Sequence, residues 1–248
     1  MSCHEDSFGL RLIEEEIFEV LFQLCSERSK NERVKMKEIL EGIDGLSKTQ
    51  LTNIIQRKLA VGKIDEETGL VVRPILVDYL PYNGILLTDE GYATAKAMQR
   101  KHRLAEVLLD KILGLEWEII HDEACCLEHG MTESIAEAIF AKLGSSLLTP
   151  YGFPIPSNSP EREVIHFNDI SLIDAPLNKT LILKRVKPSH DELLQELKKI
   201  GIKGLSTRFS KKQQEEESLI LSVNNRESEL SIKFGKRVYV SVEEEKGF

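Results

Sequence analysis

The fold of the N-terminal part is decided by residues 36–60, which read MKEILEGIDGLSKTQLTNIIQRKLA. Apolar residues recur at spacings of three and four on both sides of a short glycine-containing turn, and this pattern predicts helices at 34–42 and 48–61. Ser47, just before the second helix, is a favourable N-cap residue. Two short helices joined by a tight turn are typical of a helix-turn-helix.

The segments on either side of this motif extend it to a winged helix. Before it, an apolar stripe with acidic residues in its first turn predicts a helix over 10–25. After it, a strand–turn–strand pattern covers 79–87, with Asn83-Gly84 as the hairpin signal. A helix-turn-helix followed by such a hairpin predicts a winged-helix domain over 1–88.

The rest of the chain is predicted to be helical first and β-rich afterwards. Helices are expected at about 89–113, 116–129 and 132–143. Four prolines and a glycine between residues 149 and 160 exclude a regular helix there and indicate a connector. Alternating apolar residues beyond it, among them a strand pattern at Leu230, Ile232 and Phe234, are interrupted by one helix over 191–200 and predict a small β-barrel. The expected fold class is mainly α with β, with a winged-helix domain over 1–88, a helical domain over 89–150, a proline-rich linker over 151–175 and the barrel over 176–248.

The composition is that of an ordinary globular chain. Its 248 residues are 41% hydrophobic and 30% charged, which provides enough apolar side chains for real cores and excludes a disordered acidic chain. No apolar run approaches the roughly 18 residues of a membrane span, and no signal-peptide pattern is visible, so we expect a cytoplasmic protein. Four cysteines are too few for a disulfide framework.

Basic residues are concentrated around the helix-turn-helix. Between Arg28 and Lys63 nine residues are basic and four are acidic, a local net charge of +5 in a chain whose net charge is −8. Cations for phosphates and small polar side chains for base edges are what a helix in a DNA major groove needs. A solvated face on a protein-binding winged helix is the alternative interpretation. The candidate DNA-binding residues are Ser47, Lys48, Thr49, Gln50, Thr52, Asn53 and Arg57.

The most specific pattern is a set of metal-ligating residue types at helical spacing. His102 and Glu106 are four residues apart and therefore share one face of a predicted helix. A mixed set of imidazole, carboxylate and thiolate suits Fe(II), Mn(II), Co(II) or Zn(II). Cys126 points about 100° away from its neighbour on the helix and is expected in the core. The next helix supplies the further candidates His121, Cys125, Glu128 and His129.

These residues resemble the diphtheria-toxin-repressor (DtxR/IdeR/MntR) family in its long form. The resemblance covers most of residues 10–156. It implies a dimeric, metal-dependent transcriptional repressor that binds palindromic double-stranded operator DNA and has no enzymatic activity. It also implies a helical dimerisation and metal-binding domain and a C-terminal barrel of the Src-homology-3 type. The similarity lies in Gln99-Arg100-Lys101-His102-Arg103-Leu104-Ala105-Glu106, in His121 to His129, in Thr149 to Pro156 and, for the wing, in Pro81 to Gly91.

The resemblance further implies two metal sites. A metal bound to both the first helix and the helical domain would tie these parts together and favour the arrangement that fits DNA. On the first helix, the implied ligand is Glu16. Glu15 or Ile13 takes its place if the register of this helix against the family pattern differs. The implied primary ligands are Glu16, Cys125, Glu128 and His129. The implied ancillary ligands are His102, Glu106 and His121, with Glu192 and His190 as additional candidates from the C-terminal domain.

The resemblance points to two physiological metals, iron and manganese. A cysteine at position 125 resembles the iron-responsive branch, whereas an acidic residue at position 16 is nearer the manganese branch. We expect an Fe2+-activated repressor of metal-uptake genes. A manganese-responsive repressor and a di-metal hydrolase are the alternatives. Zn2+, Co2+ or Ni2+ are expected to substitute in vitro, because affinity at such sites follows the Irving–Williams order.

Overall fold

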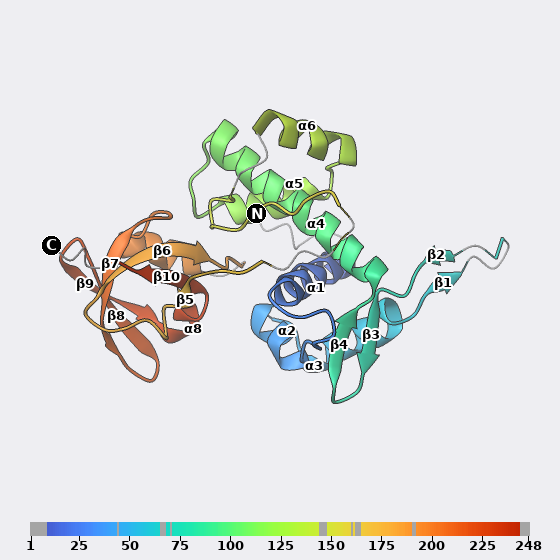
Figure 1. Ribbon diagram of the computed structural model, residues 1–248, viewed down its shortest axis with the longest axis horizontal. Coiled ribbons are helices and arrows are strands. Elements are labelled where there is room, and N and C mark those ends of the chain that lie inside the picture. The colour runs from blue at the N-terminus through green and yellow to red at the C-terminus, as the bar shows by residue number, and fades with distance from the viewer. Residues whose placement is uncertain are drawn as a thin grey trace. The chain divides into compact units, whose positions relative to one another are not determined.

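A computed structural model of the chain describes residues 9–43, 45–64, 68–69, 71–143, 148–159, 161, 165–189 and 192–243. The chain divides into two units, whose helices and strands are labelled in Figure 1. Unit 1 comprises Met1–His102 and Pro156–His166, and unit 2 comprises Arg103–Ile155 and Phe167–Phe248. Each unit has its own apolar core. Within the described ranges, no helix is both long and apolar enough to cross a membrane.

Unit 1 begins with the predicted helix-turn-helix. Ser47 caps the third helix, because its hydroxyl oxygen accepts a hydrogen bond from the amide of Gln50 at 3.2 Å. The Gln50 side chain accepts one in return from the amide of Ser47 at 3.0 Å. This capping box explains why the helix begins where the sequence predicts. The elements are helices α1 (Gly9–Ser26), α2 (Met36–Gly42) and α3 (Lys48–Ile54), followed by the π-helical turn η1 (Ile55–Leu59).

The wing is the antiparallel hairpin of β3 (Val77–Leu80) and β4 (Gly84–Leu87). Leu80 pairs with Gly84, so the turn consists of residues 81–83, and Asn83-Gly84 is not the centre of a two-residue turn. Gly84 instead serves a close approach: its φ is +109°, and a Cβ there would lie 2.4 Å from the carbonyl oxygen of Val34. Val34 and Ile85 exchange two backbone hydrogen bonds of 2.9 Å, which fasten the wing to the residues before α2.

A second short hairpin precedes the wing, and a long helix follows it. The hairpin pairs β1 (Lys63–Ile64) with β2 (Val71–Arg73). Helix α4 (Asp89–Leu108) continues into the π-helical turn η2 (Leu109–Leu113), which ends at the left-handed Gly114 as predicted. Gly91 allows the first turn of α4 to meet the wing, because a Cβ there would lie 1.8 Å from the carbonyl oxygen of Leu76.

Three basic side chains on one face of α4 hold the proline-rich connector. Lys96 is only 3% exposed and donates hydrogen bonds to three oxygen atoms of residues 157–161, at distances between 2.6 and 3.2 Å. Arg100 and Arg103 donate to the carbonyl oxygens of two connector prolines at 2.8 and 2.7 Å. The connector is therefore irregular, as the sequence predicts, but its backbone is bound to a helix.

Unit 2 ends in a six-stranded antiparallel sheet of order β5-β10-β6-β7-β8-β9 (Figure 1). Among the described residues, the terminal strands β5 and β9 do not pair with each other, so the expected barrel is an open sheet in its hydrogen bonding. The helices of unit 2 are α5 (Ile120–Glu128), α6 (Glu133–Leu143), α7 (Leu193–Lys199) and α8 (Ile232–Gly235). The strands are β5 (Ile170–Ser171), β6 (Thr180–Val186), β7 (Arg208–Gln214), β8 (Ser218–Val223), β9 (Arg226–Ser231) and β10 (Val238–Val242).

The C-terminal part of unit 2 differs from the prediction at one helix and one strand. Ile232 and Phe234, expected on a strand, lie on α8, which places the Phe234 ring in the core of unit 2. Strand β7 escapes prediction because most of its residues are polar. One of its inward positions is Lys211, whose ammonium group donates to the carbonyl oxygen of Ile173 at 2.7 Å. Burial of this ammonium group lowers the pKa of Lys211.

An ion pair joins the segment after α1 to α2. The guanidinium group of Arg28 donates to both carboxylate oxygens of Glu38, one of them at 3.1 Å. The hydrogen bond from Arg28 holds the pKa of Glu38 below its ordinary value of 4.5. Because the pKa is lower in the folded protein, the stability from this pair is complete above the ordinary value and is lost as the pH falls through the folded value.

We expect Glu38→Gln to reduce the free energy of unfolding by about 1 kcal/mol at pH 7. The amide oxygen can still accept the hydrogen bond from the Lys35 amide, so the loss reports the charge. Urea denaturation followed by circular dichroism at pH 7 and near pH 3.5 measures it. The control is Glu41→Gln, whose exposed partner Lys37 lies 3.7 Å away and which should lose less than about 0.5 kcal/mol. A deficit for Glu38→Gln that is equally large at both pH values would contradict the assignment.

Candidate metal centre

Helices α4 and α5 bury three of the predicted ligands. The exposed fractions are 2% for His102 and 3% for Glu106, one turn apart on α4, and 8% for His121 in the first turn of α5. Burying ionisable groups costs free energy unless they are paired or coordinate a cation. These three residues are therefore placed as ligands would be, and their partners within each unit decide what they can bind.

In unit 2, the imidazole of His121 lies between a carboxylate and a thiol. Its Nδ1 is 3.4 Å from Oε1 of Glu106, and its Nε2 is 4.0 Å from Sγ of Cys125. Atoms that bind one divalent ion through bonds of about 2.0–2.3 Å lie about 3 to 4 Å apart. Because the two ring nitrogens point in opposite directions, one ion can be bound through Nδ1 together with Glu106 or through Nε2 together with Cys125, and each of these pairs has a separation that fits a divalent metal. They also show that His121 is next to residues that the sequence assigned to two different sites.

The end of α5 carries Glu128 and His129. A carboxylate oxygen of Glu128 and a ring nitrogen of His129 lie within 4.8 Å of each other. Oε2 of Glu128 is buried, whereas His129 is exposed at the C-cap of the helix. Cys125 is one helical turn before them. All three side chains of the predicted primary site in unit 2 thus come from the last turns of one helix.

In unit 1, His102 has a partner that the sequence analysis missed. Its Nδ1 lies 3.5 Å from Oε1 of Glu19, on α1. Glu16, the predicted ligand, is partly buried one turn earlier on the same helix. The spacing of three between the two glutamates was a signal that could have indicated Glu19, because residues three apart share a helix face.

The remaining predicted residues lie elsewhere. Glu192 is exposed at the N-cap of α7, and His190 falls outside the described residues. Cys126 is exposed, so its expected place in the core is wrong. The buried face of α5 is formed by Ile120, His121 and Ala124, and a residue two positions after Ala124 points to the opposite side of the helix.

Tyr151 fixes the start of α5, a role that the sequence did not indicate. Its hydroxyl donates to the carbonyl oxygen of Trp117 at 2.8 Å and accepts from the amide of His121 at 3.0 Å. The ring is fully buried and meets the His121 ring edge-on, with centroids 6.3 Å apart. Amides in the first turn of a helix have no partner within the helix, so this hydroxyl replaces one.

The segment before α5 is also held from α7. The ammonium group of Lys198 forms an ion pair with Glu116 at 3.2 Å and another with Glu118. Burial, the largest single effect, pushes the pKa of Glu118 upward, but the hydrogen bond from Lys198, a backbone hydrogen bond and the charge of Lys198 together lower it below its ordinary value. Helix α5 therefore begins at Ile120, later than the predicted residue 116, because residues 116–119 form a turn bound to these partners.

Parts of this chain are similar to known proteins. Residues 88–157 match the profile of a family described as "Iron dependent repressor, metal binding and dimerisation domain". Over 70 residues, the chain is 47% identical to the iron-dependent repressor IdeR of Mycobacterium tuberculosis, and this alignment covers 28% of the chain and 30% of that protein. It is 33% identical to the diphtheria toxin repressor of Corynebacterium efficiens over 135 residues, which covers 53% of the chain and 58% of that protein.

These matches support the diphtheria-toxin-repressor family of metal-dependent repressors, and the match to the family profile covers residues 88–157 of this chain. A solved structure, the complex of a manganese-dependent transcriptional repressor with manganese, is similar with a TM-score of 0.64 and 27% sequence identity, covering 92% of this chain and 99% of that one. The chain spans 30% and 58% of the length of the two curated relatives. The profile includes the candidate ligands on α4 and α5, whereas Glu16 and α3 lie outside it.

We expect Tyr151→Phe to lower the free energy of unfolding by about 1–3 kcal/mol, because the carbonyl of Trp117 and the amide of His121 lose their shared partner. Urea denaturation followed by the fluorescence of Trp117, the single tryptophan, measures the effect. Tyr82→Phe is the control, since that side chain is fully exposed. Equal stability of Tyr151→Phe and the parent chain would show that the hydroxyl does not hold α5.

Proposed function

We propose that this chain is an iron-activated transcriptional repressor of metal-uptake genes, which acts in the cytoplasm as a homodimer bound to operator DNA. The observation that carries the proposal is the buried imidazole of His121 between Glu106 and Cys125. Such a cluster is costly to bury without a cation. The named relatives are repressors, which argues against the di-metal hydrolase.

The proposed ligands follow the family resemblance. A bound divalent ion would compensate the negative charge of the carboxylates. It would also cross-link the helices that carry its ligands. Tyr151 and Lys198 keep the start of α5 in place, so that His121 faces Glu106 before any ion binds. We assign Glu16, Cys125, Glu128 and His129 to a primary site. We assign His102, Glu106 and His121 to an ancillary site, with Glu192 and His190 as additional ligands.

Ligands drawn from distant parts of the chain make metal binding depend on how those parts are arranged. Glu16 belongs to α1, next to the helix-turn-helix, and Cys125 belongs to α5. Binding of the ion favours whichever arrangement brings its ligands together, and the effect is limited by its differential affinity for that arrangement. Converting a population from 1:99 to 99:1 requires a difference of about 10^4-fold.

The proposed DNA interface is the outward side of α3 and η1. Leu51, Ile54 and Ile55 face the core. Ser47 and Gln50 are engaged in the capping box, and the hydroxyl of Thr52 donates to the carbonyl oxygen of Lys48 at 2.8 Å. In a two-fold dimer, two such helices meet successive major grooves about 34 Å apart, which calls for a palindromic operator. The exposed candidates for base and phosphate contacts are Lys48, Thr49, Gln50, Asn53 and Arg57.

Manganese is the second candidate for the activating metal. Cys125 favours iron, because a thiolate is a soft ligand, whereas the carboxylate of Glu16 is hard and suits manganese. The similar manganese complex supports the same alternative. We therefore retain Mn2+ beside Fe2+, with Zn2+, Co2+ or Ni2+ as substitutes in vitro.

The central test is His129→Ala. We expect it to weaken metal-activated DNA binding by at least about 100-fold while the protein stays folded and dimeric, because a ligand at the end of α5 is lost. Binding is measured anaerobically with Fe(II), on a duplex selected from random-sequence DNA by the parent chain. The control is His166→Ala, an exposed histidine outside the proposed sites. Undiminished metal-dependent binding by folded His129→Ala would remove this residue from the site.

A second test concerns the metal selectivity that Glu16 confers. We expect Glu16→Met to weaken activation by Mn(II) more than by Fe(II), because a soft, neutral thioether replaces a hard carboxylate. DNA binding is titrated with each metal under anaerobic conditions. Glu15→Met is the matched control and should leave both titrations unchanged. A selective loss for Glu15→Met instead would show that the register of α1 differs, and unchanged titrations for both variants would place neither residue in the site.

A further inference from the structure

Tyr82, in the turn of the wing, combines full exposure with an unfavourable backbone. The relative exposure of its side chain is 102%. Its φ of +67° lies in the left-handed region, which a bulky L-residue enters only at a cost in free energy. A fully exposed ring buries no surface that would offset this cost. Strain in an exposed aromatic residue at the tip of a loop indicates that the ring acts on something outside the fold.

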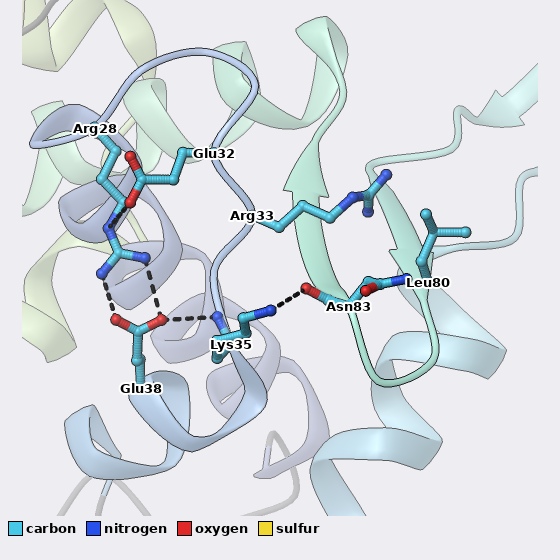
Figure 2. Close-up of a pocket in the computed structure, with 7 residues that line it drawn as sticks. All are labelled: Arg28, Glu32, Arg33, Lys35, Glu38, Leu80 and Asn83. Carbon is cyan, nitrogen blue, oxygen red and sulfur yellow. Dashed lines mark hydrogen bonds and ion pairs between the residues drawn. The ribbon is translucent and has the colours of Figure 1, made fainter.

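The turn that carries Tyr82 is held by two basic side chains from the residues before α2. Nζ of Lys35 donates to the carbonyl oxygen of Asn83 at 2.9 Å (Figure 2). Nη1 of Arg33 donates to the carbonyl oxygen of Asp78 at 3.0 Å, and the guanidinium group also forms an ion pair with the Asp78 carboxylate. The turn and the strand before it are therefore both held by basic side chains, so Tyr82 is presented on a pre-organised support.

The charges around the turn do not repel an anionic partner. No residue from 79 to 87 is charged, and the carboxylate of Asp78 is already paired with Arg33. The side chain of Lys37, two residues after Lys35, is 86% exposed and forms an exposed ion pair with Glu41 at 3.7 Å, which a phosphate can replace at little cost. A hollow of about 560 Å³ separates the wing from the start of α2 (Figure 2), and it is lined by Arg28, Glu32, Arg33, Lys35, Glu38, Leu80 and Asn83.

We propose that Tyr82 contacts duplex DNA. Its ring packs on the sugar–phosphate backbone, and its hydroxyl donates a hydrogen bond to a phosphate or base-edge oxygen. This inference rests on the proposed function and extends it to the wing. A tyrosine ring gives a large contact area with only two side-chain torsions, and the clamped turn reduces the entropy lost on binding. Lys35 and Arg33 act as positioning residues that hold the turn. Because the ring is uncharged, its contact adds affinity without releasing counterions.

The test uses the full chain with Fe(II) and the duplex selected from random-sequence DNA, with affinities measured from about 0.05 to 0.2 M salt. Tyr82→Ala and Tyr82→Gly should weaken binding about 5- to 20-fold at every salt concentration and leave the salt slope unchanged. Tyr82→Phe should stay within about 3-fold, because the ring remains. Lys48→Ala, which removes a charge, should instead reduce the slope by about 1.

Stability distinguishes a DNA contact from a structural role. Glycine adopts positive φ without strain, so Tyr82→Gly should keep the Tm within about 3 °C of the parent value or raise it, while DNA affinity falls. Ile75→Ala is the matched control, because Ile75 is 50% exposed just before the first strand of the same hairpin, away from its turn, and should bind DNA normally.

Three outcomes would overturn the inference about Tyr82 alone. These are unchanged affinity of Tyr82→Gly, an affinity loss accompanied by a fall in Tm or by dissociation of the dimer, and an equal loss for Ile75→Ala. If the metal-loaded parent chain selects no duplex, the proposed function fails together with this inference. The two failures are therefore distinguishable in one set of measurements.

Discussion

Helix α4 contributes to both cores, and the placement of the candidate ligands depends on its continuity. Tyr92 and Ala95 belong to the core of unit 1, whereas Leu104 and Ala105 belong to that of unit 2. An unbroken helix fixes the rotation and rise between any two of its residues. His102 and Glu106 are consequently one turn apart whatever surrounds them. The left-handed Gly114 ends this run and lets the chain turn towards α5.

The helices that carry the candidate ligands are supported by contacts of residues that are not themselves candidate ligands. Tyr151 replaces a missing hydrogen-bond partner at the first turn of α5, and Lys198 holds the two glutamates before it. A histidine whose two ring nitrogens face a carboxylate and a thiol must be oriented before binding, because reorientation would cost affinity. The free energy of folding of unit 2 thus maintains the geometry of the candidate centre.

In the wing, the position of the exposed residues depends on a close approach between buried backbone segments. Gly84 makes room for the carbonyl oxygen of Val34, which allows the paired hydrogen bonds with Ile85. Arg33 and Lys35, on either side of Val34, then reach the hairpin from both ends of that bridge. The basic residues around the helix-turn-helix are possible phosphate contacts by their charge, but two of them, Arg33 and Lys35, instead hold the wing.

Periodicity and capping were enough to predict most of the helices and the wing, because those signals are local. Ser47 and Gly114 mark a helix start and a helix end through hydrogen bonds and backbone angles within a few residues. The same local spacing grouped His102 with Glu106 and His121 with Cys125. Strand β7 and helix α8 were missed, because burial of Lys211 and Phe234 depends on distant strands and not on the alternation of neighbouring residues.

By itself, the sequence determined which residues share a helix face, where helices such as α3 and α4 begin, and which family the chain resembles. Only the tertiary structure decided that Glu19 lies beside His102, that His121 lies between Glu106 and Cys125, and that Tyr151 holds the first turn of α5. The physical reason is that these contacts, except that between His121 and Cys125, join residues on different elements. Their distances depend on how side chains fill a core, and spacing along the chain carries no information about that packing.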